Sequence, residues 1–153
     1  MQRIDHPLPW GCPGTERRLS VFRFGHGPCK AYIQASLHAD ELPGMRVAVE
    51  LKRRLRELEA QGRLTGMIEL VPVANPLAYA RGTRMGERNL NRRLLPTDAV
   101  REFEDRIANV LCPWLDAHDV LLDLHSFQGP GEAFAMIGPE DNNGTLEPFA
   151  HAA

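Results

Sequence analysis

The chain has 153 residues, of which 43% are hydrophobic, so residues 1–153 are expected to form a single domain with its own core. A net charge of −2, from 18 basic and 20 acidic residues, argues against a general nucleic-acid-binding or membrane-binding protein. No apolar run reaches the roughly 18–20 residues that cross a bilayer, and no secretory signal opens the chain. Cys12, Cys29 and Cys112 are widely spaced, which favours reduced thiols in a cytoplasmic protein.

The amino-terminal third predicts an irregular segment and two strands. Proline and glycine residues between positions 7 and 14 indicate an irregular lead-in. Residues 19–24 alternate between apolar and polar side chains, and residues 30–35 form a second strand-like run. Because a Gly-His-Gly-Pro turn joins the two runs, they are expected to pair as a hairpin.

The pattern then changes to a helical period. Apolar residues recur from Leu42 to Leu58 at helical spacing, with charged residues on the opposite face. Pro43 suits the first helical turn and Gly62 suits the end of the helix. Residues 67–73 predict a buried strand that ends at Asn75 and Pro76.

The second half of the chain continues the alternation of strands and helices. Residues 77–96 are polar and arginine-rich without a period, which indicates a long structured loop. Thr97 and Asp98 predict the cap of a helix that ends near Ala117. The remaining predicted elements are a strand at 120–124, a strand at 133–137, a loop at 138–143 and a helix from 146 to 153. This order favours an α/β layer fold with a largely parallel sheet.

Ligands of such sheets bind beyond the carboxyl ends of the strands, where this chain places His38, Asn75 and His125. His38 and Glu41 form an HxxE motif at a strand-to-helix junction, and one turn of helix lets positions i and i+3 face one point. Histidine nitrogens and a carboxylate oxygen are typical zinc ligands, and His125 is the candidate third ligand. Three such ligands leave a fourth position open for a water, as in catalytic sites. Asp123 would support His125 from behind.

Each of these residues also has a structural interpretation. A short HxxE match arises easily by chance, Asp40 could cap the helix, and Glu41 could favour the helix dipole. His125 could be a packing residue. The arginine-rich loop is compatible with a solvated loop, a phosphate-binding patch or a carboxylate-binding site. Its arginines are Arg81, Arg84, Arg88, Arg92 and Arg93.

Taken in order, these motifs resemble those of the succinylglutamate desuccinylase/aspartoacylase family, which is grouped with the zinc carboxypeptidase-like metallohydrolases. The resemblance spans Leu19 to Ile137. It is carried by His38-Ala39-Asp40-Glu41-Leu42-Pro43-Gly44, Asn75-Pro76, Arg84, Asn91-Arg92 and Asp123-Leu124-His125-Ser126. It implies a mixed, largely parallel sheet flanked by helices in a three-layer α/β/α arrangement.

The resemblance also implies roles for single residues. His38, Glu41 and His125 would be the ligands of Zn2+. Arg84 would be a catalytic residue that polarises the scissile carbonyl or holds a substrate carboxylate. Asn91 and Arg92 would grip the free α-carboxylate. The implied reaction is hydrolysis of an N-acyl amino acid by a metal-bound water, which makes a small N-acyl amino acid the expected partner. Mixed nitrogen and oxygen ligands suit zinc and also admit cobalt, manganese or iron.

The sequence departs from the family at the general base, a glutamate on a later strand. Only 28 residues follow His125, and none of their acids matches that glutamate. These acids are Glu132, Glu140, Asp141 and Glu147. The chain is therefore expected to be the amino-terminal portion of a longer enzyme, with an incomplete sheet whose open edge favours a homo-oligomer. Without its base, activity should fall by roughly 10²–10⁴-fold.

Three other functions stay open at this point. A carboxypeptidase-type peptidase would use the same metal and carboxylate-binding groups on short peptides. A non-catalytic metal-binding or anion-binding domain would explain the missing base. A basic-loop interaction module would bind polyanions through Arg88 and Arg93.

Overall fold

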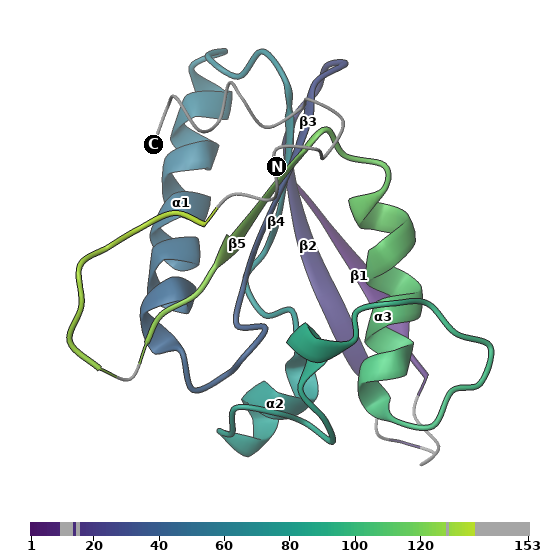
Figure 1. Cartoon of the computed structure of the whole chain (residues 1–153). Helices are drawn as coiled ribbons and strands as arrows, with labels where there is room; N and C mark the ends of the chain where they lie inside the picture. The colour runs from purple at the N-terminus through teal and green to yellow at the C-terminus, as the bar shows by residue number, and fades with distance from the viewer. Residues whose placement is uncertain (10–13, 15, 128, 137–153) are drawn as a thin grey trace.

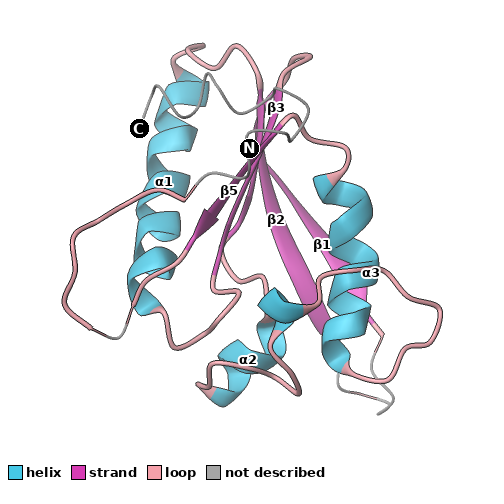
Figure 2. Cartoon of the chain, viewed as in Figure 1, coloured by secondary structure: helices cyan, strands magenta, loops and turns pink. Residues whose placement is uncertain are grey.

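A computed structural model describes residues 1–9, 14, 16–127 and 129–136. The described chain forms one five-stranded sheet with the strand order β1-β2-β4-β3-β5, flanked by helices (Figures 1 and 2). The strands are β1 (Gln2–Leu8), β2 (Arg17–Gly25), β3 (Lys30–Ala35), β4 (Met67–Val71) and β5 (Val120–Leu124). The helices are α1 (Leu42–Ala60), α2 (Pro76–Arg81), the 3-10 helix η1 (Leu90–Arg92) and α3 (Phe103–Leu115).

The sheet is mixed. β1 and β4 each pair antiparallel with β2, whereas β3 pairs parallel with both β4 and β5. The carboxyl ends of β3, β4 and β5 therefore meet at one edge of the sheet, as the sequence predicts for His38, Asn75 and His125.

Helices cover both faces of the sheet, so the expected three layers are present. Figure 1 shows α1 against one face and α3 against the other. On the α1 side, Ala48 and Leu55 are buried with Phe24 and Leu70 of the strands. On the α3 side the buried cluster includes Phe103, Ile107 and Leu111 of the helix and Val21, Tyr32 and Val71 of the sheet. Apolar burial on both faces holds the sheet between its helices.

The predicted hairpin of residues 19–24 and 30–35 is wrong, because β4 lies between β2 and β3. β4 is buried along most of its length, which suits a central strand better than an edge. The turn after β2 must therefore pass over the start of β4. Glycines make this close approach feasible, since a Cβ on Gly25 would lie 2.3 Å from the Gly66 oxygen and one on Gly27 2.7 Å from the Thr65 oxygen.

The predicted irregular lead-in is partly wrong, because β1 begins at Gln2 and includes Pro7. β1 is an edge strand with one pairing partner, and an edge is where a sheet tolerates proline. The segment 77–96 also contains the short elements α2 and η1 in place of continuous loop. Residues 133–136 form no strand.

One of the two long helices begins where the sequence predicts and the other begins later. α1 is confirmed from Leu42, with Pro43 in its first turn. α3 begins at Phe103, not after Thr97, because the Asp105 carboxylate accepts bonds from the backbone N–H groups of Arg101 and Glu102 (3.0 and 3.1 Å) and so fixes the start of the helix.

Cys29 and Cys112 are free thiols. No helix in the described part of the chain has the length and apolar character needed to cross a membrane. The predictions for Cys12, Ile137, the loop 138–143 and the helix 146–153 lie outside the described residues.

Candidate metal centre

His38, Glu41 and His125 meet at the carboxyl edge of the sheet. Each offers one ligand atom, and these three atoms lie within 4.8 Å of one another. His38 and Glu41 come from the turn between β3 and α1, and His125 directly follows β5. Because β3 and β5 are adjacent and parallel, their ends lie side by side. His38 and His125 therefore meet as their positions at strand ends predict, and Glu41 joins them through the HxxE spacing.

Two local features aim the ligands at one another. Ser36, just after β3, adopts a left-handed conformation with φ of 54°, which turns the chain sharply before His38. Gly44 lets the first turn of α1 approach β5, since a Cβ there would lie 2.9 Å from the Leu124 oxygen. The start of α1, and Glu41 with it, therefore lies close against the end of β5.

Glu41 is the centre of the cluster and is buried. Its Oε1 lies 2.9 Å from His38 Nδ1 and accepts a hydrogen bond from the Arg84 guanidinium at 3.0 Å. Its Oε2 lies 3.0 Å from His125 Nδ1 and accepts a bond from the Ser126 N–H at 2.8 Å. Burial raises the pKa of Glu41, but the Ser126 N–H and the charges of the two histidines outweigh it and hold the pKa below its ordinary value.

The far nitrogens of both rings are held by oxygen acceptors. His38 Nε2 lies 2.9 Å from Asn89 Oδ1, and His125 Nε2 lies 2.9 Å from Asp123 Oδ2. Because these oxygens only accept, both Nε2 atoms carry protons, and both Nδ1 atoms turn toward Glu41. The bond to Asp123 raises the pKa of His125, with burial opposing it and the charges of Asp123 and Glu41 adding to it.

This arrangement fits a divalent metal ion. Without an ion, each Nδ1 could bond to the Glu41 carboxylate only by taking a second proton, which would place two imidazolium rings 5.2 Å apart. With an ion, the two Nδ1 lone pairs and the carboxylate share one positive partner, and their Nε2–H groups keep the oxygen acceptors that metal-bound histidines usually have. The donor set of two imidazoles and one carboxylate is one that zinc prefers.

The alternative role of Asp40 as the helix cap is wrong. Glu41 occupies the cap position of α1 without a side-chain capping bond. The Oδ1 of Asp40 instead lies 3.5 Å from the Arg84 guanidinium, which also contacts Glu41. Arg84 therefore reaches the cluster from the arginine-rich loop and adds a positive charge beside the carboxylate.

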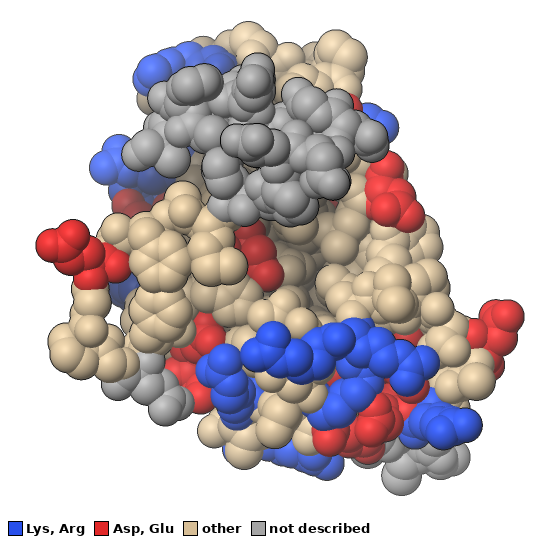
Figure 3. Space-filling model, in the orientation of Figure 1, with Lys and Arg blue, Asp and Glu red and all other residues tan. Residues whose placement is uncertain are grey.

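The other loop arginines divide into two kinds. Arg81 donates to the Gly86 carbonyl at 2.5 Å, and Arg88 pairs with Glu102 and Asp105 of the α3 start at 2.6 and 2.8 Å. The guanidinium groups of both arginines are therefore bound to other groups of the protein. Arg92 and Arg93 are exposed, and neither guanidinium has a hydrogen-bond or ion-pair partner among the described residues. Figure 3 shows basic side chains gathered in a band across the lower part of one face.

Asn91 is exposed in η1, beside Arg92, and its backbone N–H donates to Asn89 Oδ1 at 3.0 Å. Asn89 therefore links His38 to the turn that carries the two residues expected to grip a carboxylate. Asn75, expected at the site, instead caps α2 by accepting from the Ala78 N–H at 3.1 Å.

Sequence reasoning missed Asn89, the Ser126 N–H and Glu104. Asn89 directly precedes the Leu-Asn-Arg turn, so its place in the chain is a signal that could have been followed. Glu104 carries no such signal, because its hydrogen-bond partners lie 16 to 29 residues away. Glu132 is exposed, and Glu140, Asp141 and Glu147 lie outside the described residues.

The fold agrees with comparisons to known proteins. The model of the succinylglutamate desuccinylase/aspartoacylase catalytic domain matches residues 29–129. The chain belongs to this family. No curated protein sequence matches it.

Three solved structures illustrate the similarity. An aspartoacylase family protein from Mesorhizobium loti is 32% identical, with a TM-score of 0.70 over 82% of this chain. The ectoine utilization protein of Ruegeria pomeroyi, solved with product bound, is 23% identical, with a TM-score of 0.69 over 81% of the chain. A Shewanella denitrificans protein provisionally named a metallopeptidase is 17% identical, with a TM-score of 0.55 over 84% of the chain. The chain spans 40% of the length of the first two proteins and 53% of the third.

Proposed function

We propose that the chain carries the zinc centre of an enzyme that hydrolyses the amide bond of an N-acyl amino acid. The observation that carries this proposal is the paired orientation of His38 and His125. Both rings turn Nδ1 toward the Glu41 carboxylate, and both have Nε2 held by an oxygen acceptor. This is the arrangement that metal-binding histidines adopt, and family membership makes amide hydrolysis its natural use.

The site residues would have three roles: zinc binding, stabilisation of negative charge and binding of a substrate carboxylate. His38, Glu41 and His125 would hold zinc, which when bound activates a water molecule and polarises the amide carbonyl. Arg84, beside Glu41, would stabilise negative charge on the carbonyl oxygen or hold a substrate carboxylate. Arg92 has a guanidinium without a partner among the described residues, so with Asn91 it is available to bind the free α-carboxylate.

A non-catalytic domain that binds metal and anions is the second candidate. Asp40 and Asp123 are the carboxylates beside the centre in the described chain. Asp40 pairs with the Arg84 guanidinium, and Asp123 accepts a hydrogen bond from His125 Nε2. Neither is therefore free to move a proton between water and a leaving amine. In this candidate Arg84 and Arg92 bind a carboxylate ligand, and no turnover follows.

The other two candidates are weaker. A basic-loop module for polyanions would need an available Arg88, but its guanidinium is bound to Glu102 and Asp105. A carboxypeptidase would use the same groups, and the length of the substrate distinguishes it. A deacylase prefers a small acyl group on one amino acid, whereas a peptidase prefers short peptides.

The first test is the metal content of the purified chain beside His125→Ala. We expect about one zinc per chain, lost in the variant. A folded chain without bound zinc would contradict the proposal. Hydrolysis of N-acetyl and N-succinyl amino acids, compared with dipeptides, then separates the deacylase from the peptidase. A zinc-loaded chain that binds such ligands through Arg92 without turnover supports the non-catalytic candidate.

A further inference from the structure

A buried carboxylate away from the metal centre holds the loop that reaches it. Glu104, in the first turn of α3, has an exposed fraction of 0%. It accepts hydrogen bonds from three consecutive backbone N–H groups, those of Gly86 at 3.0 Å, Glu87 at 3.1 Å and Arg88 at 3.3 Å. Such convergent N–H groups stabilise a carboxylate charge that burial would otherwise make costly.

The cap of α2 contributes a further donor. Asn75, in the segment that follows β4, donates its side-chain N–H to Glu104 Oε1 at 3.0 Å. Gly86 makes the approach of the loop feasible, because a Cβ there would lie 2.4 Å from Glu104 Oε1 and 2.9 Å from Leu77 Cδ2. The carboxylate therefore joins α3, the start of α2 and the loop at a single point.

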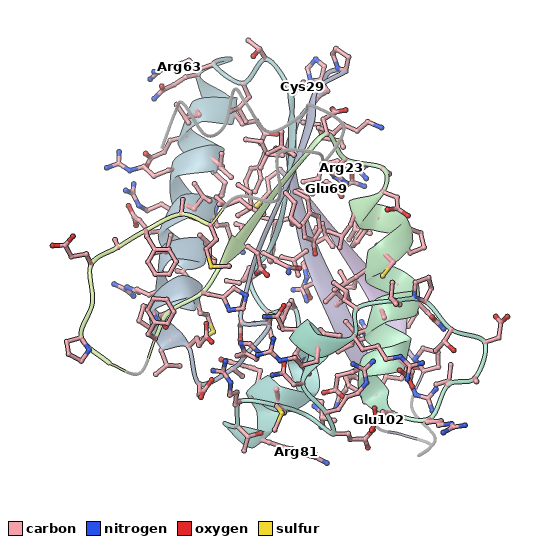
Figure 4. The ribbon with its side chains drawn as sticks, viewed as in Figure 1. Arg23, Cys29, Arg63, Glu69, Arg81 and Glu102 are labelled. Carbon is pink, nitrogen blue, oxygen red and sulfur yellow. The ribbon has the colours of Figure 1, made fainter. Side chains whose placement is uncertain are left out.

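The contacts between loop and helix run in both directions. The Glu87 carboxylate accepts a bond from the Phe103 N–H at 2.5 Å at the start of α3. The Arg88 guanidinium pairs with Glu102 and Asp105 at the start of α3. Glu102 is labelled in Figure 4. We call residues 86–88 and 102–105, which these bonds join, the loop clamp.

Asn89 is the next residue after the loop clamp and touches the metal centre through His38. If the loop moved, Glu104 would be left buried with unmet hydrogen bonds, so one position of the loop is strongly preferred. That position is the one in which Asn89 Oδ1 meets His38 Nε2. We infer that Glu104 is a positioning residue for the metal centre, acting through the loop clamp and Asn89 on the orientation of His38. This inference rests on the proposed zinc site.

The test measures zinc affinity in Glu104→Gln. The amide keeps the shape of the side chain but replaces one acceptor oxygen with a donor group, which cannot accept from the backbone N–H groups. We expect the zinc dissociation constant to rise by roughly 10–100-fold, the usual effect of losing a partner of a metal-binding histidine. The NMR signal of the His38 Nε2 proton should be lost as well, because its acceptor is displaced.

Glu69→Gln is the matched control. Glu69 is equally buried but lies on β4 away from the loop clamp. Its replacement should lower thermal stability while leaving the zinc dissociation constant within about twofold of the wild type, as expected for uncoupled sites. A merely structural role of Glu104 would give this same result.

A double-mutant cycle with Asn89→Ala tests the route. If Glu104 acts through Asn89, adding Glu104→Gln to Asn89→Ala should cause no further loss of zinc affinity. The inference would be overturned if the losses of zinc affinity of the two single variants multiplied in the double variant. It would also be overturned if a folded Glu104→Gln chain bound zinc with wild-type affinity. Should Glu104→Gln fail to fold, Gly86→Ala disturbs the same contact from the loop side and is judged by the same outcomes.

Failure of the proposed function is distinguishable. A folded wild-type chain that binds no zinc would remove the metal centre but would leave the effect of Glu104 measurable. In that case the His38 Nε2 proton signal of the metal-free chain decides. If the signal is lost in Glu104→Gln and retained in Glu69→Gln, the positioning role is supported. If the signal is retained in both variants, the positioning role is overturned.

Discussion

His125 donates a hydrogen bond from Nε2 to Asp123 Oδ2 at 2.9 Å, and the two residues are alternate positions at the end of one strand. The equivalent bond of His38 goes to the neutral amide of Asn89. One histidine of the centre is therefore supported by a charged group from its own strand and the other by an uncharged group from a distant loop. A carboxylate makes the imidazole a stronger ligand than an amide does, because it stabilises the positive charge that builds on the ring.

Replacing Asp123 should therefore weaken metal binding. Asp123→Ala leaves His125 Nε2 without its acceptor, and we expect the zinc dissociation constant to rise by roughly 10–100-fold. Isothermal titration with zinc measures the change. Asp98→Ala, which removes an exposed carboxylate far along the chain, is the control and should not alter zinc affinity. Unchanged zinc affinity in Asp123→Ala would show that the bond to His125 plays no part in binding.

Ser36 offers a test of backbone strain near the centre. Its φ of 54° is costly for a residue with a Cβ, and its buried hydroxyl has no hydrogen-bond partner among the described residues. Glycine relieves about 1–2 kcal/mol of strain but loses about 0.5–1 kcal/mol through the greater freedom of the unfolded chain. We expect Ser36→Gly to raise the free energy of unfolding by about 1 kcal/mol.

Urea unfolding of Ser36→Gly and Ser36→Val checks this expectation. A β-branched residue is poorly tolerated at positive φ, so the valine variant should be less stable than the wild type by about 2 kcal/mol. Equal midpoints for all three proteins would mean that the turn before His38 stores no strain.

The convergence of the three candidate ligands could be predicted from the sequence more easily than the residues that support them. His38 and Glu41 are close in sequence, and the strand-end rule brings His125 to them, so local spacing and one general rule suffice. Asn89 and His38 are 51 residues apart, and no periodic pattern predicts which loop side chain will meet a given ring. The support of the centre depends on packing that only the folded chain specifies.

The same limit applies to the fold. The strand β4 could be predicted from its apolar residues, but its place between β2 and β3 depends on pairing between distant segments. β1 was missed because Pro7 and the polar residues Asp5 and His6 obscure its alternation. Glu104 lies in the apolar stripe of α3, where a carboxylate would be expected to face solvent, and only its buried N–H donors explain its position.

The Asp105 carboxylate makes the free energy of unfolding of the chain depend on pH. Burial raises the pKa of its carboxyl, but the N–H groups of Arg101 and Glu102 and the Arg88 guanidinium together lower it to about 2 from an ordinary value of 3.8. A carboxyl whose pKa is lowered by folding stabilises the folded chain at pH values above its pKa in the unfolded chain. This contribution is lost as the pH falls through its pKa in the folded chain. Asp105 should therefore contribute on the order of 2 kcal/mol above about pH 4 and almost nothing below about pH 2.

The measurement compares urea unfolding of the wild type and Asp105→Asn at several pH values. The stability difference between them should shrink as the pH falls from about 4 to about 2. Asp98→Asn, at an exposed position, should differ little from the wild type throughout. A difference between wild type and Asp105→Asn that stays constant over this range would contradict the role of the Asp105 charge.

A polar cluster on the α3 side of the sheet brings together Glu69, Arg23 and His118. Glu69 lies opposite Arg23 in the pairing of β2 and β4, and its Oε1 accepts a bond from Arg23 Nε at 2.7 Å (Figure 4). Its Oε2 lies 3.2 Å from His118 Nε2, while His118 Nδ1 donates to the Trp114 carbonyl at 2.7 Å. Glu69 and His118 are both buried, and the Glu69 Oε2 and the His118 Nε2 face each other in the space between β4 and the end of α3.

Glu69→Leu should lower the free energy of unfolding by about 1–3 kcal/mol, because it removes the carboxylate that the buried His118 ring and the Arg23 guanidinium face. Adding His118→Phe removes the buried orphan, and because Arg23 is 37% exposed its guanidinium can turn to water. The double variant should regain most of the loss, since it leaves neither buried side chain of the pair facing an apolar replacement. Thermal unfolding of the two variants, with the exposed Glu57→Leu as control, measures this. A double variant no more stable than Glu69→Leu would show that packing of the strands, and not the charge pair, sets the cost.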